Sequence, residues 1–189
     1  MAAAAIRLRR AITQAKAARA SLIETTNMSP HAANHINPDH FLHRTDQQLP
    51  TPEQGKQAWA LAYAELERQL LHGEGRLTLC VVCGLQGSGK SSWVRRRDPA
   101  QGERMIFFDA ALPSPQHRGK ALDYARSAGS PAIAVWLNAP LPLALARNAQ
   151  RPPSQQVPET IIHHTQSLWQ PPQLDEGFSR VIEVDAYHF

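Results

Sequence analysis

A glycine-rich run in the middle of the chain has the residue types and spacing of a phosphate-binding loop. It reads Gly84-Leu85-Gln86-Gly87-Ser88-Gly89-Lys90-Ser91, fills the pattern G-x-x-x-x-G-K-[ST] at every fixed position, and continues with Ser92. Glycines let successive backbone N–H groups point at phosphate oxygens, Lys90 can reach the β- and γ-phosphates, and the Ser91 hydroxyl can ligate Mg²⁺. The positive end of a helix beginning near Lys90 adds to the same anion site. The pattern therefore predicts that residues 84–92 bind ATP together with Mg²⁺.

An acidic residue stands at the end of a second apolar segment. Asp109 follows Met105-Ile106-Phe107-Phe108, which predicts a buried strand over 105–109 with a carboxylate at its C-terminal end. In a parallel sheet this end lies beside the glycine run, where an aspartate can hold Mg²⁺ through water. Any buried strand can end in Asp, so the pattern gains its meaning from the glycine run. We expect Ser91 and Asp109 to form a metal site, with Asp109 also a candidate for catalysis.

Two arginines, Arg147 and Arg151, stand four positions apart, on one face of the helix expected after the third strand. In one interpretation they form a lid whose guanidinium groups close over the phosphates and stabilise charge on the transferring group. In the other they belong to a solvated helix end, where the helix dipole favours cations. The first interpretation makes Lys90, Asp109, Arg147 and Arg151 the candidate catalytic residues.

Histidines are concentrated in the segment 26–50, which is also rich in Asn, Pro, Thr and Asp. The set comprises His31, His35, His40 and His43, with Asp39 among them. A metal site is one interpretation, but neither a cysteine nor a predicted helix supports it. We expect a polar loop or linker whose histidines face solvent.

Apolar and helix-compatible segments alternate through the rest of the chain. Strands are expected at 77–83, 105–109, 132–137 and 181–185, and helices near 90–97, 115–128, 140–150 and 157–169. This alternation predicts an α/β fold with a short parallel sheet flanked by helices in three layers. A further helix, capped by Thr51 and Gln54, should run to about His72. We expect residues 1–75 to form an N-terminal helical extension with a His-rich linker and residues 76–189 to form the phosphate-binding domain.

Charge is unevenly distributed along the chain, which has 189 residues and a formal net charge of +4. The basic residues Arg7, Arg9, Arg10, Lys16 and Arg19 all precede the first acid, Glu24. Apolar residues at helical spacing favour an amphipathic helix over residues 1–25, with an organellar transit peptide as the alternative. A basic helix of this kind could dock a protein partner or a polyanion.

The hydropathy of the chain and its two cysteines indicate the cellular compartment of the protein. No apolar stretch approaches the length of a membrane span, so we expect a cytoplasmic protein with no membrane partner. Cys80 and Cys83 stand three apart in a strand, so their side chains should point to opposite faces and form neither a disulfide nor a shared metal site. They are typical of core residues in a reducing compartment. Trp93, Trp136 and Trp169 are expected in the core or at its rim, where an exposed one could stack a base.

From Val82 to the C-terminus the chain resembles the polynucleotide-kinase-like branch of P-loop kinases, which is close to the zeta toxins. The resemblance rests on Gly84 to Trp93, Phe108 to Pro113, Gln116 to Arg118, Leu145 to Pro152, Val157-Pro158 and Pro171 to Phe178. Many NTPases share the glycine run, but the ordered series, including Glu176-Gly177-Phe178 before the last strand, is far more specific. The resemblance implies a three-layer P-loop NTPase fold. It also implies that Lys90 and Ser91 bind phosphates and Mg²⁺, that Asp109 is the Walker B acid, and that Arg147 and Arg151 belong to the lid.

One departure from the family pattern concerns the general base. Similar kinases carry a further strand after the P-loop helix, and its terminal aspartate acts as base on the acceptor hydroxyl. This chain passes from Arg97 to Met105 without room for that strand. Asp109 could then act as base, as metal-directed acid or as both, or the base could come from the N-terminal 75 residues, where Asp39, His40 and Asp46 are candidates. The third alternative is that an efficient acceptor site is absent.

These observations predict an ATP-dependent phosphotransferase. The expected kinase moves the γ-phosphoryl group to a hydroxyl of a nucleic-acid end, a nucleotide or a related small molecule, mainly by positioning and charge stabilisation. A zeta-toxin-like sugar-nucleotide kinase is one alternative. A nucleotide-gated binding module or ATPase that lacks an acceptor substrate is another.

Overall fold

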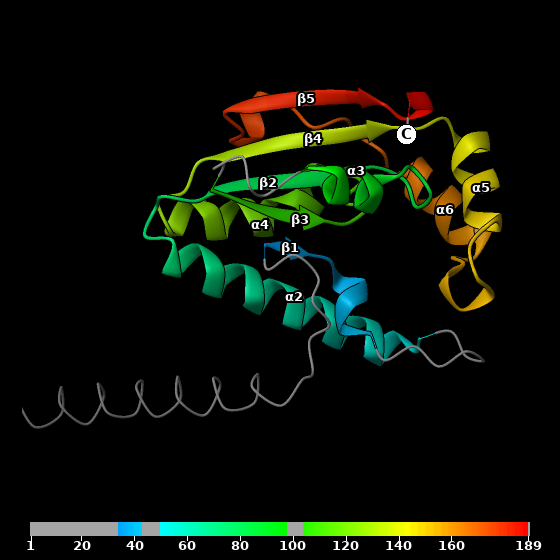
Figure 1. Ribbon diagram of the computed structural model, residues 1–189, viewed down its shortest axis with the longest axis horizontal. Helices are drawn as coiled ribbons and strands as arrows, with labels where there is room; N and C mark the ends of the chain where they lie inside the picture. The colour runs from blue at the N-terminus through cyan, green and yellow to red at the C-terminus, as the bar shows by residue number, and fades with distance from the viewer. Residues whose placement is uncertain (1–33, 43–49, 98–103, 189) are drawn as a thin grey trace, which may run out of the picture. The chain divides into compact units, whose positions relative to one another are not determined.

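The computed structural model describes residues 34–42, 50–97 and 104–188. The helix expected over residues 1–25, together with His31, His43 and Asp46, lies outside these ranges. A compact unit begins at Asn34. Its centre is a parallel sheet of five strands in the order β1-β3-β2-β4-β5 (Figure 1). The strands are β1 (His35–Ile36), β2 (Thr78–Cys83), β3 (Met105–Asp109), β4 (Ala132–Asn138) and β5 (Arg180–Asp185).

Helices cover both faces of this sheet. They are α2 (Pro52–His72), α3 (Lys90–Arg96), α4 (Pro115–Ser127), α5 (Leu141–Ala149) and α6 (Glu159–Ser167), with short 3-10 turns at Pro38–Phe41, Pro153–Gln155, Leu174–Glu176 and Ala186–His188. The α/β class and the helix-flanked parallel sheet predicted from the alternating segments are confirmed. Helix α2 begins with the expected capping box, in which Thr51 and Gln54 exchange hydrogen bonds.

Side chains of alternate strand residues build two separate core layers. Leu79 and Val81 of β2 pack on the face covered by α2 and α4, whereas Cys80 and Val82 pack on the face covered by α3. The period of two follows from the pleat of a strand. Cys83 lies on the α2 and α4 face, so the two cysteines occupy opposite faces, and both are free and buried. Within the described ranges, every helix is too short or too polar to cross a membrane.

The segment 26–50 was predicted to be a loop or linker, and this prediction is wrong for its described part. Strand β1 pairs parallel with β3, with His35 opposite Phe107, and a 3-10 turn follows. His35 is 8% exposed instead of facing solvent. A strand of this length has no measurable periodicity, and its pairing depends on the free edge of β3. The described residues 34–42 and 50–75, predicted as part of an extension, therefore contribute β1 and α2 to the same packed unit as the rest of the sheet.

Candidate functional site

The carboxyl ends of all five strands lie at one edge of the sheet, and the candidate residues gather there. Loop 84–89 leaves β2 at this edge and leads into α3, while Asp109 closes β3. Strand β1 ends at the same edge, because it runs parallel to β3 with Ile36 opposite Phe108. The next residue, Asn37, therefore comes level with Asp109. Sheet topology thus brings the glycine run, the predicted acid and an N-terminal segment together.

The glycine loop, residues 84–89, is packed too closely for side chains at two positions. Gly84 and Gly87 have φ angles of 148° and 87°, which glycine adopts without penalty. A Cβ atom at Gly84 would stand 2.6 Å from the carbonyl oxygen of Leu137, and one at Gly87 would collide with the carbonyl oxygen of Ala144. These contacts hold the loop between the end of β4 and helix α5.

The Lys90 ammonium group folds back onto this loop. It donates hydrogen bonds to the carbonyl oxygens of Gly84 and Leu85, at 3.0 and 2.8 Å. Burial lowers the pKa of Lys90, the negative charge of Asp109 raises it in part, and the positive charge of Arg151 lowers it again, so that the net shift is downward. An anion bound here would favour the charged form of the lysine.

Asp109 accepts three hydrogen bonds on one carboxylate oxygen. The donors to Oδ2 are Ser91 Oγ at 2.6 Å, His35 Nε2 at 3.0 Å and Asn37 Nδ2 at 3.0 Å. Burial raises the pKa of Asp109, but the hydrogen bond from His35, the charge of Lys90 and the hydrogen bond from Ser91 together lower it below the ordinary value. The carboxylate is therefore ionised at neutral pH, and His35 Nε2 carries the shared hydrogen.

The other oxygen of this carboxylate is suited to a metal ion. Asp109 Oδ1 is buried and lacks a hydrogen-bond partner within the described residues. Carboxylate and hydroxyl oxygens are the ligands that Mg²⁺ prefers, and Mg²⁺ usually adds water and substrate phosphate to one or two protein ligands. Among the described residues, His, Cys, Asp and Glu form no group of three that could hold a metal. Ser91 and Asp109 therefore fit an ion that is shared with a bound phosphate, and they do not fit a site made wholly of protein ligands.

The turn after β1 brings a second aspartate toward the glycine loop. Asp39 lies in the turn Pro38–Phe41, where its backbone N–H donates to Asn37 Oδ1 at 2.8 Å. The side chain is exposed, and its negative charge raises the pKa of Lys90 against the larger effect of burial. The His40 ring packs edge-on against His35, with ring centroids 4.9 Å apart. Of the N-terminal base candidates, Asp39 and His40 thus lie in the turn after β1, where the charge of Asp39 acts on Lys90, and Asp46 lies outside the described residues.

The two arginines of the predicted lid have different surroundings. Arg147, in the last turn of α5, donates through Nη2 to the carbonyl oxygen of Ala186 at 2.9 Å. Arg151 acts on Lys90 through its charge. Between them, Asn148 is buried and exchanges two hydrogen bonds with the backbone of Val157, at 2.8 and 3.0 Å. Asn148 therefore closes the loop that carries Arg151 and fixes where that loop leaves the helix.

A buried ion pair lies under the loops at the carboxyl ends of the strands. Arg118 is fully buried and makes two hydrogen bonds to Glu176, both of 2.7 Å. Its Nη1 donates to the carbonyl oxygens of Leu112 and Gln170, at 2.9 and 3.1 Å. The pair therefore joins the loop after β3, the start of α4 and the segment before β5. Both residues belong to motifs on which the family resemblance rests. In the structure they hold the loops around the site in position.

An aromatic hollow of about 320 Å³ opens beside the glycine loop at the end of β4. Its walls include Leu85 of the loop, Trp136 and Asn138 of β4, and Gln166 and Trp169 at the end of α6. The two indole rings stack with centroids 5.9 Å apart. All residues that line the hollow are uncharged.

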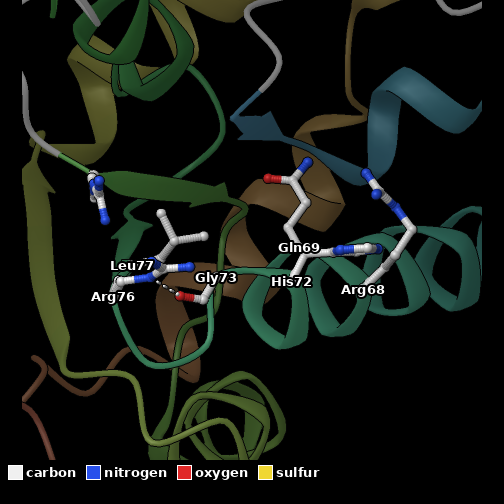
Figure 2. A pocket seen from close by; sticks show the side chains of 7 residues that line it. Arg68, Gln69, His72, Gly73, Arg76 and Leu77 are labelled. Atoms are coloured by element: carbon white, nitrogen blue, oxygen red, sulfur yellow. Dashed lines mark hydrogen bonds between the residues drawn. The ribbon is translucent and has the colours of Figure 1, made fainter.

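A basic hollow of about 420 Å³ lies at the opposite ends of the strands, where Leu77 and Arg104 precede β2 and β3 (Figure 2). Arg68, Gln69, His72, Gly73 and Arg76 complete its lining. Arg68 pairs with Glu65 at 2.6 Å and Arg76 with Glu74 at 3.0 Å, so much of the positive charge is already neutralised. The predicted site residues all lie at the other edge of the sheet.

The chain was compared with known proteins. No family model matches it, and neither does any curated protein.

Two residues that contact Asp109, His35 and Asn37, were not predicted from the sequence as part of the site. Both donate to Asp109, across sequence separations of 74 and 72 residues. The local signals were the concentration of histidines, which gave His35 no partner, and the Asn37-Pro38 pair, which marks a turn but gives no direction to the side chains. Pairing of β1 with β3 had to be known before either residue could be placed beside Asp109.

Proposed function

We propose that this protein is an ATP-binding P-loop kinase of the polynucleotide-kinase-like kind. It would transfer the γ-phosphoryl group of ATP to a hydroxyl of a nucleic-acid end, a nucleotide or a related small molecule. The observation that carries the proposal is the contact of 2.6 Å between Ser91 Oγ and Asp109 Oδ2, next to the glycine loop and Lys90. The serine of the loop and the acid of the neighbouring strand are the pair that hold Mg²⁺ in P-loop NTPases.

Mg²⁺ would be held by Ser91 and Asp109 together with phosphate oxygens, and it would neutralise charge on the transferring group. Lys90 would exchange its two carbonyl partners for phosphate oxygens, since its ammonium group lies within reach of the loop that would cradle them. The fixed positions of Gly84 and Gly87 would keep the cradle in place before ATP binds. These residues position charge and need no covalent step of their own.

Asp39 is the residue that we propose as general base. Strand β1 lies beside β3, and its turn delivers a carboxylate to the edge at which the chain was expected to lack one. Asp109 is poorly suited to this role, because its Oδ2 already accepts three hydrogen bonds, its Oδ1 is the oxygen suited to Mg²⁺, and the residue is fully buried. Asp39 is exposed and can take the proton of an acceptor hydroxyl. The acceptor oxygen then bonds to the γ-phosphorus while the bond to the bridging oxygen of ADP breaks.

Arg151 is the better candidate for charge stabilisation in the lid. Its positive charge already acts on Lys90, whereas Arg147 donates to the carbonyl oxygen of Ala186. A guanidinium group at this place would stabilise charge on the equatorial oxygens during transfer. Arg147 would instead hold α5 to the segment after β5.

The proposal is tested by following γ-labelled phosphate from ATP into RNA ends, DNA ends, nucleosides, nucleotides and sugar nucleotides. We expect label in at least one of these acceptors with the parent protein and none with Lys90→Ala. Lys56→Ala, at an exposed position of α2, is the matched control and should retain the parental rate. Transfer by Lys90→Ala at the parental rate would show that the mechanism is wrong. Label in sugar nucleotides alone would favour the zeta-toxin-like activity, and ATP binding without any labelled product would favour a nucleotide-gated module.

The assignment of the base needs a separate comparison. Asp39→Asn should lower kcat about 100-fold or more while leaving ATP affinity unchanged, because a general base contributes at that level. Asp109→Asn should instead weaken Mg²⁺ binding, so that a higher Mg²⁺ concentration is needed for half-maximal turnover. Asp175→Asn removes an exposed carboxylate from the turn Leu174–Glu176 and is the control. An unchanged kcat for Asp39→Asn would return the role of base to His40, Asp46 or Asp109.

A further inference from the structure

We infer that the aromatic hollow at the end of β4 is a nucleobase subsite. This inference rests on the proposed function, since the base would belong either to the phosphoryl donor or to the acceptor. The chemistry of the two sources is the same: a flat, uncharged heteroaromatic ring with hydrogen-bonding edges. Four features of the hollow support this occupant.

The first feature is its position relative to the glycine loop. Leu85, the first variable residue of the loop, forms part of the wall of the hollow. The next residue, Gln86, donates from Nε2 to Thr165 Oγ1 at 3.2 Å and so ties the loop to α6. A ligand in the hollow and a phosphate on the loop would therefore be held by the same rigid segment.

The second feature is an aromatic wall that is supported from behind. Trp136 points to the sheet face covered by α2 and α4, because Val135 and Leu137 on either side of it face α3. Trp169 packs both on that core and on the small cluster that contains Leu85. The two indole rings stack on each other and both residues line the hollow, and aromatic side chains of this kind are the groups on which bases stack.

The third feature is the polar composition of the rim. Asn138 and Gln166 carry amide groups, which can both donate to and accept from the edge of a base. Asn138 Nδ2 already donates to Glu183 at 2.7 Å, which fixes the amide at the edge of the sheet. The absence of charged residues from the lining of the hollow disfavours phosphate or carboxylate as the occupant and favours a neutral ring.

The fourth feature is a buried polar atom on a residue that lines the hollow. Trp169 Nε1 is buried and has no hydrogen-bond partner within the described residues. Leaving a buried donor or acceptor without a partner is costly, so such atoms commonly have a partner that is a water or a ligand. The backbone of Trp169 is held by Gln166 and that of Gln170 by Pro113, at 3.1 and 2.7 Å, so the indole has little freedom to find another partner.

The size of the hollow agrees with this occupant. About 320 Å³ lies at the lower end of the range of small-molecule sites and leaves room for a ring system but not for a whole oligonucleotide. Any remaining sugar and phosphates would extend out of the hollow along Leu85 toward the glycine loop.

The experiment measures tryptophan fluorescence of the full chain during titration with adenosine, guanosine, cytidine and uridine. We expect at least one nucleoside to quench the parent protein, and Trp136→Ala to weaken that binding about tenfold, as the loss of one stacking partner predicts. Asn138→Ala, at an exposed position, guards against misfolding and should weaken the same binding about threefold. Trp59→Phe, on α2, also removes one fluorophore and should leave the affinity unchanged.

Two further ligands separate the sources of the base. If the donor base binds in the hollow, Trp136→Ala and Asn138→Ala weaken ATP binding but leave the affinity for inorganic tripolyphosphate with Mg²⁺ unchanged. If the acceptor base binds there, both affinities stay unchanged and the KM of a nucleoside or nucleotide acceptor rises. Nucleoside quenching without any binding of ATP or tripolyphosphate would retain the subsite and reject the kinase. Parental affinities of both variants for every nucleoside and for ATP would overturn the subsite.

Discussion

His35 Nε2 lies 3.0 Å from Asp109 Oδ2, although 74 positions separate the two residues in the chain. The contact exists because the short strand β1 runs along the outer edge of β3 in parallel register. Together with hydrogen bonds from Asn37 and Ser91, this contact stabilises the ionised form of a fully buried carboxylate. The N-terminal segment thus becomes part of the candidate metal site.

His35→Ala should weaken the response of the protein to Mg²⁺. Removing a hydrogen bond that orients a metal-binding carboxylate commonly costs 10- to 100-fold in metal affinity, and we expect at least about tenfold here. The measurement is the Mg²⁺ concentration at half-maximal ATP binding. His163→Ala, exposed on α6, is the control and should not differ from the parent. Equal Mg²⁺ curves for the parent and His35→Ala would mean that Asp109 does not face the ion.

Gly87→Ala should disrupt the glycine loop, since a Cβ atom there meets the carbonyl oxygen of Ala144 and the φ of 87° is unfavourable for alanine. We expect loss of ATP binding and a lower Tm. Gly119→Ala is the matched control inside α4, where a Cβ atom has nothing within 4 Å. This control should raise the free energy of unfolding by about 0.5–1 kcal/mol, because alanine favours helix. A neutral Gly87→Ala would contradict the close packing of the loop.

Arg118→Ala should be one of the most destabilising single substitutions in the described chain. It leaves Glu176 charged and partly buried and removes the donor to two carbonyl oxygens, so we expect a loss of about 3–5 kcal/mol in the free energy of unfolding. Arg126→Ala breaks the exposed pair with Asp123 and should cost about 1 kcal/mol or less. Urea unfolding of both variants measures the difference. Similar losses for the two arginines would argue against a supporting role for the buried pair.

Alkaline titration should report the packing of α2 on the sheet. Burial, and then the charge of Tyr124, raise the pKa of Tyr63 to about 12. Because this folded-state pKa lies above the ordinary value, the stabilising effect of the neutral phenol is complete below pH 10 and is lost as the pH rises toward 12. Absorbance at the tyrosinate band should show one late-ionising group that Tyr63→Phe removes. Tyr187→Phe, at an exposed position, is the control and should leave this late-ionising group in place.

Acid titration should show that Asp109 contributes to stability with the opposite pH dependence. Its folded-state pKa lies below the ordinary value, so the ionised carboxylate stabilises the fold above pH 4 and the contribution is lost as the pH falls through the lowered pKa. Asp109→Asn should therefore be less stable than the parent at pH 7, and the difference should shrink on acidification. A constant difference from pH 7 to pH 2 would contradict the assignment of an ionised Asp109.

Local patterns in the sequence were sufficient for most of the elements. The apolar runs before Gly84 and up to Asp109 determine two neighbouring strands, and Thr51 with Gln54 determines where α2 begins. In each case the decisive interactions lie within a few residues, either as the period of a pleated strand or as a capping box. The glycine pattern likewise determined the tight loop between β2 and α3.

Tertiary structure decided which residues meet across the edge of the sheet. Strand β1 was invisible in the sequence, because a strand of two residues is stabilised by pairing with β3 and by burial of Ile36, and both depend on contacts far away in the chain. For the same reason the positions of His35, Asn37 and Asp39 beside Asp109 and Lys90 could only be found in the folded protein. The sequence by itself determined the loop and its acid, and the parallel stacking of distant strands decided which side chains surround them.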